Sequence, residues 1–198
     1  LAIMIVAYDG PLKKTLLAPV AMGCCRVLSF LLGASPCLGS YVAAAGQSVD
    51  GPLFPRFVIA IAVGFGLYIM GITTIARNEA VGGPSPDLYR GLFLTMIGAA
   101  VLAFAPRTAV GNFNWHISPH DGFPLLIGMI GFPVILRGLR LVNDPTAEKI
   151  QMMVRVGILT MIPLAAAFAF LGAGAVWGLL VISLVIPAIF LARQFRVT

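Results

Sequence analysis

Six ionisable residues gather in three short stretches of the chain, and their types suit the binding of an anionic group. A lysine acts on phosphate as a compact point charge, whereas an arginine presents a planar fork of donors. A carboxylate at the same place can help to hold a metal ion or position a second substrate. The six residues are Asp9, Lys13 and Lys14 before the first long apolar stretch, Arg26 within it, and Arg77 and Glu79 after the second.

Arg26 is the most informative of these residues because it lies inside an apolar stretch. If residues 15–34 form a helix, Arg26 lies about 17 Å beyond Thr15, since a helix rises 1.5 Å per residue. At that depth the side chain does not extend easily to water. An ionisable side chain within a bilayer usually faces a cavity or a partner. We therefore interpret Arg26 as a cation that faces a cavity and helps to hold an anionic group.

Each of these residues also has a simpler structural interpretation. Lys13 and Lys14 could serve as anchors at the membrane surface, and Arg26 could pair with Asp9 or Glu79. A surface ion pair after the second apolar stretch would contribute little to stability. Individually the signals are weak, and their shared position at one side of the chain is what favours a binding site.

His116 and His120, followed by Asp121, have the i, i+4 spacing of a metal-binding pair. Pro119 lies between them, and the arrangement typical of a zinc protease is absent from the sequence. We therefore expect a loop or interfacial position for both imidazoles rather than a metal site.

Neither the cysteines nor any known catalytic motif in the sequence indicates the chemistry of a soluble enzyme. Cys24, Cys25 and Cys37 lie in or beside an apolar stretch and lack metal-binding spacing, so we interpret them as small buried thiols. The sequence contains no phosphate-binding glycine loop and no nucleophile-elbow motif.

The chain is a series of apolar stretches long enough to cross a bilayer. Its mean hydropathy is +1.01. Of its residues 60% are hydrophobic and 10% are charged, far fewer charges than the surface of a soluble domain carries. We predict an all-α, polytopic transmembrane bundle of about six complete spans, preceded by the end of an earlier helix at 1–8. The predicted spans are 15–34, 55–76, 89–105, 122–141, 149–171 and 175–192.

Basic residues lie almost entirely on one side of this predicted zigzag. That side comprises 8–14, 77–90, 137–149 and 193–198, and the other side has Arg56 and Arg107. Lys and Arg near helix ends are retained on the cytoplasmic face, so we predict that these four segments are cytoplasmic. The predicted location is a bacterial cytoplasmic membrane. The basic residues behind the net charge of +6 would then contact lipid head groups or an anionic substrate, and no nucleic acid partner is expected.

Local signals add detail to the spans. Gly64, Gly66 and Gly71 would thin one surface of the second span for close helix contact. Asp144 is predicted to cap the fifth helix, with Pro145 in its first turn. Residues 172–174 are predicted to join the last two spans as a tight hairpin, and Trp115 fits an interfacial belt.

The basic and apolar segments together resemble the UbiA superfamily of intramembrane prenyltransferases, in a divergent branch near the 4-hydroxybenzoate polyprenyltransferases. The resemblance is carried by 8–15 (YDGPLKKT) with 18–28 (APVAMGCCRVL), by 67–79 (LYIMGITTIARNE) and by the closing stretch 143–198. It extends over nearly the whole chain and rests on spaced patterns rather than on one diagnostic motif. It implies one transmembrane domain, 1–198, that forms the C-terminal part of a longer chain.

The resemblance also implies a reaction. Members of this superfamily bind an isoprenoid diphosphate through Mg²⁺ held by two aspartate-rich loops, and they attach the prenyl group to an aromatic or other lipophilic acceptor. Carried over to this chain, Lys13, Lys14, Arg26 and Arg77 would bind the diphosphate. Asp9 and Glu79 would be the catalytic residues, and Glu79 would also contribute to the metal site.

The sequence departs from the family pattern at the metal site. The first aspartate-rich motif is expected upstream of Leu1. At the second motif, Thr73 stands near the first aspartate and Glu79 is the carboxylate near the second, while Ala165 stands where a polar residue is expected. We therefore expect this part of the chain to be inactive alone.

Two other functions remain open. A non-catalytic lipid-binding membrane protein could keep the fold without the metal site. A small transporter would require polar residues at mid-membrane and broken helices in paired halves, which the later spans largely lack.

Overall fold

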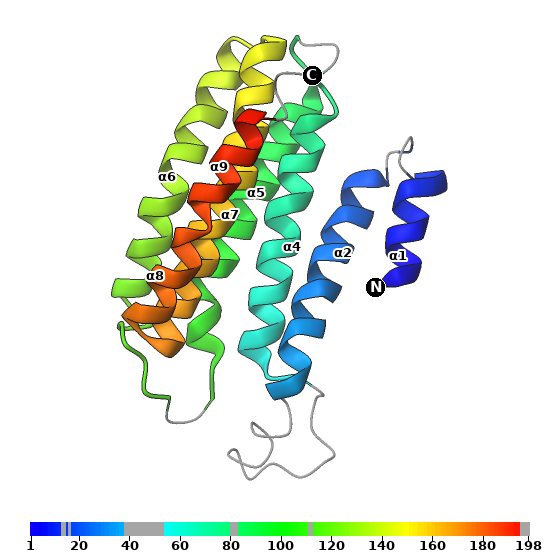
Figure 1. Cartoon of the computed structure of the whole chain (residues 1–198). Helices are drawn as coiled ribbons and strands as arrows, with labels where there is room; N and C mark the ends of the chain where they lie inside the picture. Colours follow the sequence, from blue (N-terminus) through cyan, green and yellow to red (C-terminus); the bar gives the residue numbers. More distant parts are fainter. Residues whose placement is uncertain (13–14, 16, 38–53, 80–82, 111–112, 195–198) are drawn as a thin grey trace.

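The computed structural model of this chain describes residues 1–12, 15, 17–37, 54–79, 83–110 and 113–194, and every long regular element among them is a helix (Figure 1). The elements are α1 (Ala2–Ala7), a kinked helical turn η1 (Tyr8–Leu12), α2 (Ala18–Ala34), η2 (Ser35–Cys37), α4 (Arg56–Ala76), α5 (Pro86–Phe104), η3 (Ala105–Thr108), α6 (Gly122–Asn143), α7 (Ala147–Ala173), α8 (Ala175–Ser183) and α9 (Val185–Gln194).

Four helices are long and apolar enough to cross a membrane, which supports the prediction of a helical membrane bundle. They are Arg56–Ala76, Pro86–Thr108, Gly122–Asn143 and Ala147–Ala173. The apolar segments Ala18–Ala34 and Ala175–Leu191 are shorter than these. At 1.5 Å per residue, the 17 residues of α2 cover about 26 Å, slightly less than the hydrocarbon thickness of a bilayer.

The long helices alternate in direction, and α4 lies at the centre of the bundle with α2 on one side and α5 and α7 on the other (Figure 1). Arg77, Arg90, Arg137, Arg140 and Lys149 therefore lie near the same end of the bundle. The two connections at that end are joined, because the Gly83 N–H donates to the carbonyl oxygen of Pro145 at 2.9 Å.

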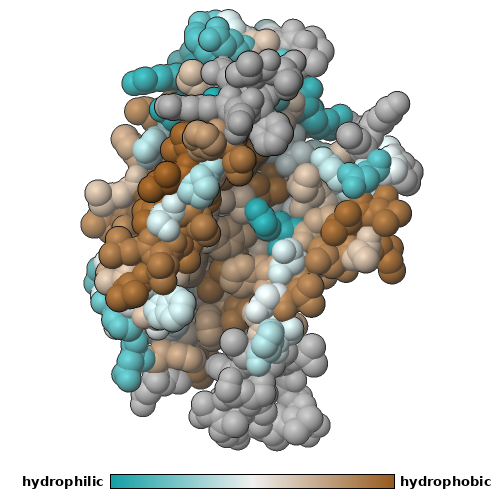
Figure 2. All heavy atoms as spheres, in the orientation of Figure 1, coloured by the Kyte–Doolittle hydropathy of each residue, from teal (hydrophilic) through white to brown (hydrophobic). Residues whose placement is uncertain are grey.

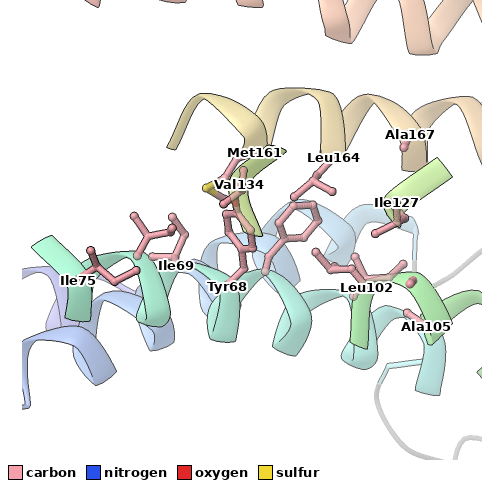
Figure 3. Close-up of a cluster of buried hydrophobic side chains, with 14 of the residues drawn as sticks. Tyr68, Ile69, Ile75, Leu102, Ala105, Ile127, Val134, Met161, Leu164 and Ala167 are labelled. Atoms are coloured by element: carbon pink, nitrogen blue, oxygen red, sulfur yellow. The ribbon is translucent and has the colours of Figure 1, made fainter. Parts of the chain in front are cut away.

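The core is formed where α4 meets α5, α6 and α7. Figure 3 shows Tyr68 and Ile69 of α4 close to Val134 of α6 and to Met161 and Leu164 of α7. The Tyr68 hydroxyl donates to the carbonyl oxygen of Gly157 at 3.0 Å, so this buried polar group is satisfied.

Close contact between α4 and α5 depends on glycine in both helices. A Cβ on Gly98 would lie 2.7 Å from the Cα of Tyr68 and 2.9 Å from the carbonyl oxygen of Gly64. Gly66 instead faces α2, where its Cβ would lie 3.1 Å from the carbonyl oxygen of Gly23. The prediction that Gly64, Gly66 and Gly71 thin one surface is thus wrong: α4 uses two surfaces, because a helix packed between neighbours needs close approach on both.

Two predicted helix starts differ from the structure. α5 begins at Pro86, earlier than predicted, because the Ser85 hydroxyl accepts a hydrogen bond from the Asp87 N–H at 3.2 Å. α7 is capped by Thr146, whose hydroxyl accepts from the Lys149 N–H at 3.4 Å. Asp144, the predicted cap, ends α6 and pairs with Lys149.

The last predicted span is two helices. α8 ends at Ser183 and α9 begins at Val185, with Pro187 in the first turn of α9. Proline has no N–H to bond back to the Ser183 carbonyl, so the helical ladder is interrupted there. The predicted tight hairpin is confirmed: Gly174 alone separates α7 from α8, and its φ of +92° is one that glycine adopts readily.

Candidate functional site

A cavity of about 540 Å³ lies between α1, α2, α4 and α7. Figure 2 shows a hollow on this face between α2 and the rest of the bundle, with hydrophilic atoms inside an otherwise hydrophobic surface. Each helix contributes residues spaced three or four apart, which is the spacing of one helix face. The lining residues are Leu1, Ile5 and Tyr8; Met22, Cys25, Arg26 and Ser29; Ile69, Ile72, Thr73 and Ala76; and Val154, Ile158 and Met161.

Arg26 is the one charged residue among these lining residues. It is the ninth of the 17 residues of α2, so its Cα lies about 12 Å from the helix start and near the middle of the helix. The prediction that Arg26 faces a cavity is consistent with this position. The side chain is exposed to the cavity rather than packed into the core.

The guanidinium of Arg26 reaches across the cavity to α7. Its Nη2 lies 3.6 Å from the Sδ of Met161, and a thioether sulfur is only a weak acceptor. No described carboxylate lies within salt-bridge distance of Arg26, so the alternative pairing with Asp9 or Glu79 is not formed. A guanidinium beside only a weak acceptor and apolar walls keeps its donors available, which suits an anionic ligand.

The polar groups beside Arg26 are few and neutral. The Thr73 hydroxyl donates to the carbonyl oxygen of Ile69 at 2.8 Å, so its proton is used within α4. Tyr8 of η1 also lines the cavity and is half-buried. Cys25 and Ser29 complete the polar part of the wall on α2.

The structure does not bring the six residues of the predicted site together. Asp9 is exposed in η1 and does not line the cavity. Lys13 and Lys14 lie outside the described residues. Arg77 ends α4 and lies 3.9 Å from the Asp87 carboxylate, in a cluster that Arg90 joins at 3.5 Å.

Glu79 is half-buried in the turn that follows α4, where its N–H donates to the carbonyl oxygen of Ala76 at 3.0 Å. It does not line the cavity. The neighbouring Asn78 has a buried side-chain nitrogen that finds no hydrogen-bond acceptor among the described residues. This turn therefore holds one carboxylate and one unsatisfied donor close to the end of the helix that lines the cavity.

Sequence reasoning missed two residues of the site. Tyr8 and Met161 are 153 positions apart, and neither type is unusual beside or within an apolar stretch. Met161 occupies a helix face with Val154 and Ile158, which resembles an ordinary core face in the sequence. Only the packing of α2 and α7 against α4 shows that this face meets Arg26.

His116 and His120 lie in the connection between η3 and α6. His120 accepts a hydrogen bond from Arg107 through its backbone oxygen, and the His116 N–H donates to the Leu171 carbonyl at 3.1 Å. Within the described part of the chain, no group of three or more His, Cys, Asp and Glu residues is placed to hold a metal ion.

The site is therefore an apolar cavity with one guanidinium near the middle of a helix. An amphipathic molecule with an anionic head matches this combination of charge and walls. Comparison of the chain with models of protein families, with curated proteins and with solved structures finds no match.

Proposed function

We propose that the Arg26 cavity binds an isoprenoid diphosphate, and that the protein transfers the prenyl group to a lipophilic or aromatic acceptor within the membrane. The observation that carries this proposal is the single guanidinium in an otherwise apolar cavity. An isoprenoid diphosphate has an anionic head for Arg26 and an apolar tail for the walls. The resemblance to the UbiA superfamily supports the same substrate class.

The cavity suits the chemistry of prenyl transfer. Departure of diphosphate develops negative charge, which a nearby guanidinium stabilises. The allylic cation that remains must be kept from water, and the Ile69, Ile72 and Ile158 side chains provide an apolar wall. In this proposal Arg26 binds the leaving group, and the isoleucines hold the prenyl chain.

The described residues do not fit a Mg²⁺ site. Mg²⁺ sites in proteins use one or two carboxylates together with phosphate oxygens, and neither Asp9 nor Glu79 lines the cavity. We therefore derive no step through Mg²⁺ from this structure. A requirement for Mg²⁺ stays a prediction from the family resemblance.

We also propose an orientation in the membrane. The end with Arg77, Arg90, Arg137, Arg140 and Lys149 would face the cytoplasm of a bacterial cell, because basic residues near helix ends are retained there. Bilayer lipids would then be constant partners of the exposed apolar faces.

A non-catalytic lipid-binding protein is the second candidate. It is favoured by one observation, that no carboxylate is found among the described residues that line the cavity. In that case the cavity would hold an anionic lipid without cleaving it.

The test is binding of radiolabelled geranylgeranyl diphosphate to the reconstituted protein, with and without Mg²⁺. We expect Arg26→Ala to weaken binding by about 10-fold or more, since a hydrogen bond to a charged group contributes about 1.5–3 kcal/mol. Arg26→Lys should recover part of the loss. Arg137→Ala, an exposed cation on α6 outside the cavity, is the matched control.

Equal binding by the wild type and Arg26→Ala would contradict the proposal. Formation of a prenylated product from an aromatic acceptor separates the two candidate functions. Binding that depends on Arg26, with the diphosphate recovered intact and independent of Mg²⁺, would favour the non-catalytic protein.

A further inference from the structure

A second cavity, of about 570 Å³, lies at the end of the bundle opposite the Arg77–Asp87 cluster. Its described lining residues belong to η3 and to the stretches 109–110 and 113–120 that follow η3 (Figure 1). Its character differs from that of the Arg26 cavity, since polar side chains contribute much of its wall. The lining residues are Pro106, Arg107, Ala109, Phe113, Asn114, Trp115, Pro119 and His120.

Arg107 is held in this cavity by two independent contacts. Its Nη2 donates a hydrogen bond to the backbone oxygen of His120. Its guanidinium carbon also lies 4.7 Å from the centre of the Phe104 ring, a favourable cation–π position. The charge is thus fixed before any ligand arrives, which lowers the entropic cost of binding.

Neutral donors accompany this cation. Trp115 and Asn114, whose side chains carry N–H donors, also line the cavity. The Trp115 ring is in turn positioned by Phe113, at 5.1 Å between ring centres, and by Phe57, at 6.2 Å. No Asp or Glu is found among the described lining residues; the nearby Asp121 begins α6 outside the cavity. The donor set suits an anion.

The position of the cavity indicates where the anion comes from. It lies where α5 ends and α6 begins, which is the depth of lipid head groups if these two helices span the bilayer. Trp115 is of the type enriched at that depth. Phe104 and Val110 are exposed beside it, where acyl chains would pass.

We propose that this second cavity binds the phosphate group of an anionic phospholipid. Arg107 would contact the phosphate, and Trp115 and Asn114 would donate further hydrogen bonds. Phosphate binding would also explain why Arg107 lies at the end of the bundle that has few basic residues. The proposal is independent of prenyl transfer, because it uses none of the residues of the Arg26 cavity.

The test uses the full chain in nanodiscs of phosphatidylcholine with phosphatidylglycerol. The phosphatidylglycerol that remains bound after detergent washing is counted by native mass spectrometry. We expect Arg107→Gln to lower the bound fraction by about fivefold, the effect of one basic residue near anionic lipid. Arg56→Gln is the matched control, since Arg56 is exposed at the same end and does not line the cavity. Equal losses in the two variants would overturn the proposal.

Arg107 also donates a hydrogen bond to the His120 backbone, so its substitution could disturb the local fold. A second pair of variants separates this structural effect from lipid binding. Trp115→Phe removes the indole N–H together with part of the ring, keeps an aromatic side chain, and should lower retention about twofold. Arg107→Lys keeps the charge and should retain more lipid than Arg107→Gln. Wild-type retention by Trp115→Phe, together with equal losses in Arg107→Lys and Arg107→Gln, would overturn the proposal. Displacement of the lipid by millimolar glycerol phosphate would show that a soluble anion is the ligand instead.

Discussion

Tyr68 of α4 and Gly157 of α7 are joined by a hydrogen bond of 3.0 Å in the middle of the core, from the phenol to the backbone oxygen. The Tyr68 side chain is almost fully buried, so this bond connects two membrane-spanning helices away from water. It lies in the same part of α7 as Met161, one turn further along, which contacts Arg26. The wall of the Arg26 cavity is therefore tied to the core of the bundle.

Tyr68→Phe should cause a small loss of stability. We expect about 0.6 kcal/mol, the average for hydrogen bonds between membrane helices, and at most about 1.7 kcal/mol, because the Gly157 oxygen still accepts the bond within α7. Unfolding of the purified protein in mixed micelles measures it. Tyr89→Phe is the control, since Tyr89 is 60% exposed. The stability of the Tyr89→Phe variant should equal that of the wild type. Equal losses in both variants would contradict a role for the buried phenol.

Gly98→Ala should destabilise the contact between α4 and α5. The added methyl would meet the Tyr68 backbone, which cannot rotate away as a side chain could, so we expect a cost of about 1–3 kcal/mol. Gly128→Ala in α6 is the matched control because nothing lies within 4 Å of its Cβ position. That variant should be neutral or slightly stabilising, since alanine favours a helix over glycine. Melting temperatures in detergent test the difference.

Thr146→Ala should cost about 1 kcal/mol, because it removes the side-chain cap of α7. Asp144→Ala should cost less, since the Asp144–Lys149 pair is exposed and such pairs contribute little. Chemical unfolding of the two variants side by side measures both effects. A larger loss for Asp144→Ala would restore Asp144 as the cap.

Arg77→Ala should weaken binding of an isoprenoid diphosphate much less than Arg26→Ala. Arg77 is paired with Asp87 at 3.9 Å and does not line the cavity, whereas Arg26 does. The same radioligand assay compares the two variants at equal protein concentration. An equal loss in both would place the diphosphate at the end of α4 and return Arg77 to the site.

Much of the fold follows from hydropathy along the sequence, because long apolar stretches in a bilayer must satisfy their own backbone groups and so become helices. Details at helix ends were less predictable. Both Asp144 and Thr146 are good capping residues. In the structure the Asp144 carboxylate pairs with the Lys149 ammonium, and the Thr146 hydroxyl caps α7. Gly66 could not be assigned to α2 before the packing was known.

The candidate site was predicted only in part. Arg26 was identifiable because a charge within an apolar stretch is unusual. Arg77 was not excluded by sequence, since Asp87 is ten positions away and becomes its partner only through the turn between α4 and α5. The contact between Arg26 and Met161 depends on two helices that are far apart in the chain.

The one-residue turn at Gly174 has a consequence for biosynthesis. If α7 spans the bilayer, α8 folds straight back beside it, because only Gly174 separates the two helices. The two helices would then enter the bilayer as one folded-back pair, with the apolar α7 and its nine-residue neighbour inserted together. A longer side chain at Gly174 would strain the backbone and press on His116, so it would be expected to act first on the yield of inserted protein.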